Sequence, residues 1–358
     1  MKLLRRLSPV SIFLCICAVY ITGFFAHALY LHKTVYGDGI YYYSWLRSAV
    51  VDHTINFPDG NKYSIGPAIF WAPAFLLVHQ VLRGDGYTLP YQLGTGLTSV
   101  LATLFALALL WRMLRKYFST TVSIMTVAAI AGATNLLFYG SIDTVNSHAL
   151  SFFTAVIFLT LLLQKQKNWF AMGGALGFLG LMRTQDILYG ILLIPYISKK
   201  NILLIITGFL LVFSLQLIAW QLLYGKFWVS PYLLHEVFNF TSPHIFDVLF
   251  NVQNGLFLWT PITLLGTIGL ITKKRFLLLS VFLLELYTVA SWSTWSQGAS
   301  YSGRMFVSTL PILAFGIASI FSWLTRYKWT RAYFLITIVI PLSVINVILM
   351  TFFLLHLH

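Results

Sequence analysis

Charged side chains are scarce in this sequence. Asp, Glu, Lys and Arg make up 9% of its 358 residues, whereas about 25% is usual in a soluble globular protein. Hydrophobic residues make up 59% of the chain, and the mean hydropathy is +0.83. These values exclude an ordinary soluble domain, and they exclude a disordered chain more firmly still. The sequence therefore predicts a protein that lies largely within a lipid bilayer.

Cysteine is nearly absent, and so is the alternation of polar and apolar residues that marks a strand. Cys15 and Cys17 lie in the first apolar run, where a helix points them apart, so no disulfide framework is expected. Long apolar runs without alternation exclude the strands of a membrane barrel. No sequence cluster of His or Cys has the spacing of metal ligands, so no dedicated metal site is predicted.

The apolar runs predict an all-α polytopic membrane protein, because helices satisfy their own backbone hydrogen bonds in lipid. Since about 20 residues cross a bilayer, we expect about eleven transmembrane helices within one integral-membrane domain, residues 1–358. The expected spans are 8–31, 91–111, 121–140, 147–163, 168–183, 186–198, 201–224, 255–272, 276–292, 305–324 and 333–355.

The net charge of +14 comes from 23 basic and 9 acidic residues. In a membrane protein such an excess indicates topology, because cytoplasmic loops collect Lys and Arg; it does not predict nucleic-acid binding. With a cytoplasmic N-terminus, most basic residues fall in cytoplasmic loops. The apolar segment 65–82 would invert this arrangement if it crossed, so we expect an amphipathic or re-entrant helix on the outer surface. The basic residues assigned to the cytoplasm are Lys2, Arg5, Arg6, Arg112, Arg115, Lys116, Lys165, Lys167, Lys199, Lys200, Lys273, Lys274, Arg275, Arg326, Lys328 and Arg331.

Acids are absent from every expected cytoplasmic loop. Only Glu285 falls within a span, and we assign it no role. Any acid–base chemistry is therefore expected on the extracytoplasmic face of a plasma or inner membrane, in the outer loops 32–90, 225–254 and 292–304. The outer acids are Asp38, Asp52, Asp59, Asp85, Asp143, Asp186, Glu236 and Asp247.

The first outer loop begins with an acid in a distinctive setting. Asp38 follows the first span directly and lies between Gly37 and Gly39, which permit a tight turn. Three tyrosines follow at positions 41–43. One interpretation is a helix N-cap within an aromatic belt at the membrane surface. The other is a functional carboxylate.

This arrangement resembles the C-type integral-membrane glycosyltransferases, in particular the branch of protein O-mannosyltransferases and aminoarabinose transferases. The resemblance rests on Asp38, on a long outer loop with juxtamembrane helices, and on the Lys–aromatic–Pro–Trp stretch from Lys62 to Trp71. It implies the C-type fold, a polyprenyl-phosphate-linked sugar donor, and Asp38 as the catalytic carboxylate. Two features depart from the family: its acidic pair is broken by Gly39, and one proline is missing after Lys62.

Further residues become candidates through the same resemblance. His148 lies nearest the family's second acid, with Asp143 five residues before it; both are candidate catalytic residues, although His148 could simply hydrogen-bond at a helix start. Arg183 matches a basic residue placed to hold lipid phosphate, with an ion pair to Asp186 as the alternative. Arg304 lies in a Gly–Arg loop similar to one that approaches the phosphosugar.

Three more residues are expected to contact substrate. Lys62 belongs to the family's basic stretch, while Trp295 and Tyr301 could stack on sugar or polyprenyl, or else belong to an aromatic belt. The loop 225–254 contains Glu236 and other polar groups for which we predict no role.

These features predict a glycosyltransferase that moves a sugar from a polyprenyl-phosphate carrier to an acceptor hydroxyl outside the cytoplasm, with inversion. Asp38 would take the hydroxyl proton, and Arg183 and Arg304 would stabilise the leaving phosphate. A glycan, a lipid or a protein could be the acceptor, and a divalent cation could assist. The alternatives are a transporter of lipid-linked glycans and a non-catalytic subunit of glycan assembly. A transporter is disfavoured because no internal repeat is seen.

Overall fold

The computed structural model describes residues 8–55, 57, 60–228, 230–326 and 333–356. Among these residues there is no β-strand, and a single bridge pairs Phe238 with Trp292. The predicted all-α architecture is therefore confirmed for the described part of the chain. Six charged residues that the sequence assigned to one side of the membrane lie outside these ranges: Lys2, Arg5, Arg6, Asp59, Lys328 and Arg331.

Five of the described helical segments are long and apolar enough to cross a membrane, so the chain is an integral membrane protein. Helix α1 begins at Pro9 behind the cap Ser8, whose side chain accepts from the backbone amide of Ser11. The total of about eleven spans stays a prediction. The five segments are α1 (Pro9–Leu31), α4 (Leu89–Leu114), α9 (Lys199–Tyr224), the 3₁₀ helix η4 (Arg304–Thr309) continued by α15 (Leu310–Leu324), and α16 (Tyr333–His356), whose qualifying stretch is Thr337–His356.

The remaining apolar helices are shorter, and one expected span has another form. Residues 186–198 were predicted to cross as a helix, and the structure has a 3₁₀ helix, η3 (Thr184–Tyr196), of 13 residues. Because a 3₁₀ helix rises about 2.0 Å per residue, η3 covers about 26 Å. The shorter apolar α-helices are α3 (Gly66–Leu82), α5 (Thr120–Gly132), α7 (Ser147–Leu162), α8 (Trp169–Met182), α13 (Ile262–Thr272) and α14 (Phe276–Ser291).

Helix α7 lies at the centre of the bundle and packs against α4, α8 and η4. Helices α8 and α9 pack tightly because glycines face the neighbouring backbone: a Cβ on Gly173 would collide with the carbonyl of Ile205. Short helices complete the fold: α6 (Leu136–Ser141), α10 (Pro231–His235), α11 (Ile245–Phe250) and α12 (Leu256–Trp259).

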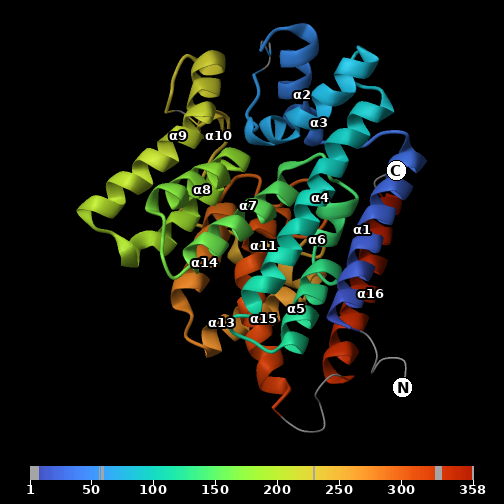
Figure 1. Cartoon of the computed structure of the whole chain (residues 1–358), viewed down its shortest axis with the longest axis vertical. Coiled ribbons are helices and arrows are strands. Elements are labelled where there is room, and N and C mark those ends of the chain that lie inside the picture. Colours follow the sequence, from blue (N-terminus) through green and yellow to red (C-terminus); the bar gives the residue numbers. More distant parts are fainter. Residues whose placement is uncertain (1–7, 56, 58–59, 229, 327–332, 357–358) are drawn as a thin grey trace.

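The two ends of the molecule differ in what they carry. At one end, α2 (Gly39–Arg47), the π-helix η2 (Ser48–Asp52) and α3 lie together, with α10 nearby (Figure 1). At the opposite end, where α1 begins, lie the connections α4–α5 and α13–α14 and the end of α15. Helix α3 packs on α2 and α4, and its place on the outer surface stays a prediction. Which end faces the cytoplasm stays a prediction.

Candidate active site

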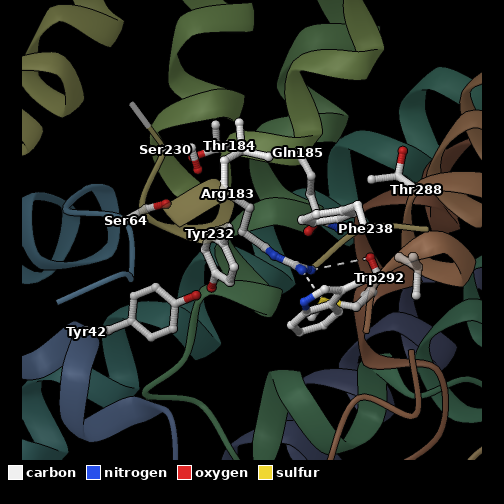
Figure 2. Close-up of a pocket in the computed structure, with 13 residues that line it drawn as sticks. Tyr42, Ser64, Arg183, Thr184, Gln185, Ser230, Tyr232, Phe238, Thr288 and Trp292 are labelled. Carbon is white, nitrogen blue, oxygen red and sulfur yellow. Dashed lines mark hydrogen bonds between the residues drawn. The ribbon is translucent and has the colours of Figure 1, made fainter. Parts of the chain in front are cut away.

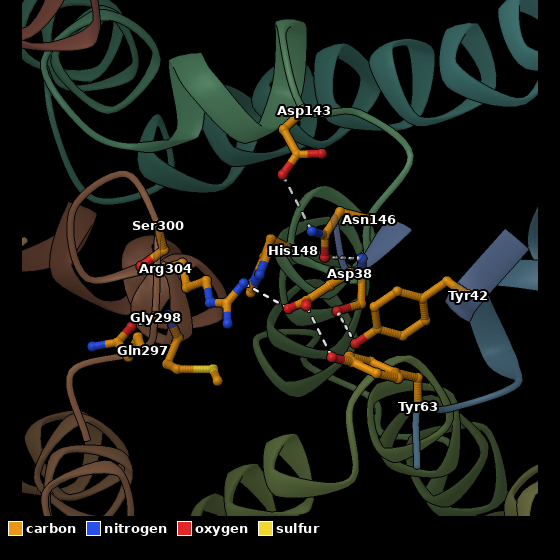
Figure 3. Close-up of polar contacts among 12 residues, drawn as sticks. Asp38, Tyr42, Tyr63, Asp143, Asn146, His148, Gln297, Gly298, Ser300 and Arg304 are labelled. Atoms are coloured by element: carbon orange, nitrogen blue, oxygen red, sulfur yellow. Dashed lines mark hydrogen bonds and ion pairs between the residues drawn. The ribbon is translucent and has the colours of Figure 1, made fainter. Parts of the chain in front are cut away.

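Asp38 occupies the N-cap position of α2, but its side chain does not cap the helix. Instead its carboxylate joins two distant segments: Tyr63 donates a hydrogen bond to Oδ1 at 2.9 Å, and Arg304 donates to Oδ2 at 2.6 Å. Burial raises the pKa of Tyr63 above its usual value, and the charge of Asp38 raises it further, so this hydroxyl stays a donor. The N-cap interpretation of Asp38 is therefore wrong for the side chain, which belongs to a polar cluster (Figure 3).

The two glycines beside Asp38 have separate structural reasons. Gly37 has a φ of 52°, in the left-handed region that glycine adopts without strain. Gly39 packs against the connection between α6 and α7, and an added Cβ there would collide with the carbonyl oxygen of Val145. The missing second acid of the family pair is thus explained by packing, since position 39 has no room for a side chain.

Asp143 lies in that same connection, close to the Asp38 cluster. The side-chain amide of Asn146 donates to its Oδ2 at 3.2 Å, whereas Oδ1 is buried and has no hydrogen-bond partner among the described residues. Burial raises the pKa of Asp143 to about 7, with a smaller contribution in the same direction from the charge of Asp38. Asp143 is therefore partly protonated near neutral pH.

A cavity of about 430 Å³ opens on these groups. Asp38, Asp143, Asn146 and Arg304 form its polar wall. The Nε of Arg304 is buried and, like Oδ1 of Asp143, has no partner among the described residues. A buried donor and a buried acceptor without protein partners are groups that a polar ligand would satisfy. We call this space the Asp38 cavity.

Arg183 follows α8 and is buried, with 6% of its surface exposed. Its Nη1 lies 3.1 Å from Nδ1 of His148 and donates to the carbonyl of Met305 at 3.3 Å, and its Nη2 contacts the Met305 sulfur. Because a guanidinium can only donate, Nδ1 of His148 is the acceptor. The predicted alternative, an ion pair with Asp186, is not among the ion pairs of the described residues.

Arg183 lines a second cavity of about 240 Å³ (Figure 2). Tyr42, Tyr232 and Trp292 supply aromatic walls to what we call the Arg183 cavity. Burial raises the pKa of Tyr42, while Arg183 acts to lower it and Asp38 to raise it, so the hydroxyl of Tyr42 senses both charges. The same hydroxyl bonds to Ser147 at 2.8 Å, which ties α2 to the start of α7.

Consecutive residues of η4 line the two cavities. Arg304 lines the Asp38 cavity, and Met305 lines the Arg183 cavity. Asp38 and Arg183, which lie 145 positions apart in the sequence, therefore contact neighbouring residues of η4. Asp38 bonds to Arg304, and Arg183 bonds to Met305. Such an arrangement can place a proton acceptor and a phosphate-binding cation on two sides of one reacting carbon.

Sequence reasoning missed the role of Glu236. Lys62 donates to its Oε1 at 2.6 Å, and Trp292 donates to its Oε2 at 3.2 Å. Burial alone would raise the pKa of Glu236, but the Lys62 ammonium and hydrogen bonds from Trp292 and Thr294 hold it below its usual value. Glu236 therefore links the three segments 32–90, 225–254 and 292–304. The signal in the sequence was a glutamate within an aromatic-rich loop. Its partners lie too far away in the sequence to be identified from it.

Lys62 therefore pairs with Glu236. Two other residues that were predicted to contact substrate, Tyr301 and Trp295, also have partners within the protein. Tyr301 is fully buried, and its hydroxyl donates to Oδ1 of Asn346 at 2.6 Å. The ring of Trp295 stacks on His244, with centroids 4.9 Å apart. Substrate stacking by these two aromatics stays a prediction. Glu285 is buried within α14 and accepts a hydrogen bond from Gln185.

No family model and no curated protein sequence matches this chain. Its fold, however, is similar to that of the oligosaccharyltransferase of Archaeoglobus fulgidus. The apo structure superposes with a TM-score of 0.58 and 11% identity, over 94% of this chain and 55% of that one. Its complex with an inhibitory peptide and a dolichol phosphate gives a TM-score of 0.55 and 12% identity, over 96% and 55%.

These matches show the fold of a C-type membrane glycosyltransferase. The chain spans about half the length of the structures it matches. The predicted branch of O-mannosyltransferases and aminoarabinose transferases stays a prediction.

A third structure of the archaeal enzyme contains Zn and sulfate, with a TM-score of 0.57 and 11% identity, over 95% of this chain and 52% of that one. The described residues alone do not form a site for a divalent cation, and assistance by such an ion stays a prediction. Within the described part of the chain, no three His, Cys, Asp or Glu side chains are grouped as metal ligands. At the Asp38 cavity only two carboxylates are available, and Arg304 already neutralises Asp38.

Proposed function

We propose that this protein transfers a sugar from a polyprenyl-phosphate carrier to an acceptor hydroxyl, with Asp38 as the general base. The observation that carries the proposal is that two consecutive residues, Arg304 and Met305, line the two cavities. The donor phosphate would bind in the Arg183 cavity, and the acceptor hydroxyl would bind in the Asp38 cavity. The similarity of the fold to a membrane oligosaccharyltransferase supports the same reaction class.

In the proposed step the acceptor hydroxyl gives its proton to Asp38 as its oxygen attacks the anomeric carbon. The bond from that carbon to the phosphate oxygen breaks, and the phosphate keeps the electron pair. In this proposal the base and the phosphate-binding cation act from opposite sides of the reacting carbon, so the attack would come from the face opposite the leaving group, with inversion. Holding both substrates in adjoining cavities would supply a large part of the rate.

The arginines have distinct proposed roles. Arg183, fixed by His148 and Met305, would stabilise the charge on the leaving phosphate. Arg304 would hold the carboxylate of Asp38 in position through Nη1, while its Nε, which has no partner among the described residues, could bind a phosphate or sugar oxygen. Asp143, which faces the same cavity, would orient the acceptor through its free Oδ1.

We place the site on the extracytoplasmic face of a plasma or inner membrane, with about eleven spans and a cytoplasmic N-terminus. Two facts support this orientation. The connections α4–α5 and α13–α14, which carry basic clusters, lie at the end of the molecule opposite α2 and α3 (Figure 1). The positive-inside rule assigns that basic end to the cytoplasm.

The test is sugar transfer by purified protein in vesicles that contain a radiolabelled polyprenyl-phosphate sugar. Asp38→Asn should lower kcat by about 100-fold or more, because general-base catalysis contributes at least that much. Arg183→Ala should weaken donor binding about tenfold or more, the cost of a lost charge-assisted hydrogen bond. Full turnover by a folded Asp38→Asn protein would remove Asp38 from the mechanism. Movement of the lipid-linked sugar across the bilayer without product would indicate a transporter.

A further inference from the structure

An apolar groove of about 540 Å³ runs between α1 and α16. Both helices pack on α5 more extensively than on each other, so α5 forms the floor of the groove. Val19 on α1 and Val344 on α16 line its two sides, and both are half exposed. The hydroxyl of Tyr20, which lines the groove, is engaged within the protein, since it donates to the carbonyl of Ala131. The lining is mostly apolar, so the groove suits a hydrocarbon chain.

The groove leads toward the Asp38 cavity. The same helices line both spaces: on α1 the lining passes from Tyr20 to His27, and on α16 from Ile348 to Phe353. At 1.5 Å per helical residue these steps are about 10 Å and about 8 Å. Leu137 of α6 lines the groove, and the next residues of α6 line the cavity. One side of the Asp38 cavity is thus built from the ends of two membrane helices.

Asn346 fixes the position of α16 between the groove and the Asp38 cavity. Its side-chain amide donates to the carbonyls of Gly132 and Thr134 at 2.8 and 2.9 Å, and its oxygen accepts from Tyr301. The asparagine is fully buried between the groove and the cavity. These bonds hold α16 against the end of α5 and against Tyr301 in loop 292–304. The groove and the cavity therefore keep their positions relative to each other.

We infer that the acceptor is a membrane lipid whose hydroxyl-bearing head group enters the Asp38 cavity and whose hydrocarbon chain lies in the α1–α16 groove. This inference rests on the proposed function, because it takes Asp38 as the group that receives the acceptor proton. A head group with negative charge would meet Lys33 and Arg304, which both line the cavity. A water-soluble acceptor would have no use for the groove.

The donor's polyprenyl chain is the other hydrocarbon that could occupy the groove, and the position of the phosphate site argues against it. The Arg183 cavity is lined by α14, α10 and the start of η3, and no residue of α1 or α16 lines it. A donor phosphate in that cavity places its chain beside α14. The two lipids would then approach the reacting carbon from different sides of the protein.

The test compares acceptors with and without chains. The protein is reconstituted in phosphatidylcholine vesicles, whose head group has no hydroxyl, with a radiolabelled polyprenyl-phosphate sugar. One arm adds the lipid extract of the membranes in which the protein is made. The second adds the same extract after deacylation to water-soluble head groups, and a third adds a peptide with free hydroxyls. We expect transfer in the first arm and at least about tenfold less in the others, because the chain contributes its burial to binding.

Matched tryptophan variants separate the groove from general effects on the helices. Val19→Trp and Val344→Trp should fill the groove and raise the KM for the lipid extract about tenfold. Leu14→Trp and Ile345→Trp lie on the same helices, outside the groove and comparably exposed, and should behave like wild type. Release of polyprenyl phosphate by slow transfer of the sugar to water should be equal in all four variants.

The outcomes distinguish this inference from the proposed function. If sugar transfer to water and to every acceptor is absent, or is unaffected by Asp38→Asn, the proposed function fails. If transfer depends on Asp38 but the deacylated head groups or the peptide accept sugar as well as the lipid extract does, only the lipid acceptor is overturned. Equal activity of Val344→Trp and Ile345→Trp would also overturn it.

Discussion

The guanidinium of Arg304 lies 2.6 Å from the carboxylate of Asp38, although 266 positions separate the two residues in the chain. Both side chains are mostly buried, with 16% and 28% of their surfaces exposed. The resembled family commonly has a second acid beside its first one, whereas this chain gives the single acid an arginine partner. The pair joins the first outer loop to the last, so it positions Asp38 as well as neutralising it.

Replacement of Arg304 should therefore affect the chemical step. We expect Arg304→Ala to lower kcat about 100-fold, because it removes the group that orients Asp38 and leaves a partly buried carboxylate unpaired. Arg304→Lys should be intermediate, since an ammonium keeps the charge but loses the planar fork. Initial rates of sugar transfer measure both. Lys226→Ala, an exposed change in another outer loop, is the control, and an Arg304→Ala protein as active as this control would contradict the role.

Removal of divalent cations should leave the activity intact. The Asp38 cavity offers two carboxylates, and Arg304 already pairs with one of them, so the protein supplies few ligands for a divalent cation there. We expect transfer rates to change less than about twofold after dialysis against EDTA. The measurement is the initial rate with and without added Mg²⁺, Mn²⁺ and Zn²⁺. A loss of activity that one of these ions restores would show that substrate completes a metal site.

The sequence was informative about the membrane fold, because that fold depends on local composition, whereas the face that carries the acids stays a prediction. Apolar runs indicate helices, and Asp38, Arg183 and Arg304 stand out as charges near apolar segments. The Asp38–Arg304 pair could not be predicted, since periodicity carries no information about contacts between distant loops. For the same reason the bond of Tyr301 to Asn346 could not be predicted, since it depends on how α16 packs.

Gly39 should not tolerate a side chain. Gly39→Ala would bring a Cβ against the carbonyl of Val145, and such overpacking typically costs about 1–3 kcal/mol. We expect a lower thermal unfolding temperature in detergent and reduced transfer, because α2 carries Asp38 at its start. Gly39→Asp, which restores the family's acidic pair in sequence, should lose activity as well. An active, stable Gly39→Asp protein would show that α2 can shift without harm to the site.

Asp143 should make stability depend on pH near neutrality. Its pKa is raised in the folded protein to about 7 from an ordinary value of 3.8, so between these values the folded state binds more protons than the unfolded state. The free energy of unfolding therefore falls as pH rises through this window, and the loss is complete above about pH 7. Asp143→Asn cannot titrate, so it should unfold at a higher temperature than wild type at pH 8 and show a smaller difference at pH 5. An equal difference in unfolding temperature between Asp143→Asn and wild type at both pH values would contradict the raised pKa.

The contact of Lys62 with Glu236 should hold the outer loops together over the site. Their atoms lie 2.6 Å apart, and their side chains are 33% and 14% exposed. Since the pair is only partly buried, we expect a coupling free energy of about 1 kcal/mol in a double-mutant cycle of Lys62→Ala and Glu236→Ala. Glu236→Ala should be the more harmful single change, because Trp292 also donates to this carboxylate.

Exchange of the two charges tests whether Lys62 only joins the loops through Glu236 or also binds substrate. Lys62→Glu combined with Glu236→Lys keeps an ion pair but moves the positive charge to loop 225–254. If the pair only joins the loops, the swapped protein should recover most of the stability and activity lost in either single charge reversal. If Lys62 itself binds substrate, as the sequence predicted, stability should return while the KM for the donor stays raised. Thermal unfolding and donor titration of the same preparations distinguish these two results.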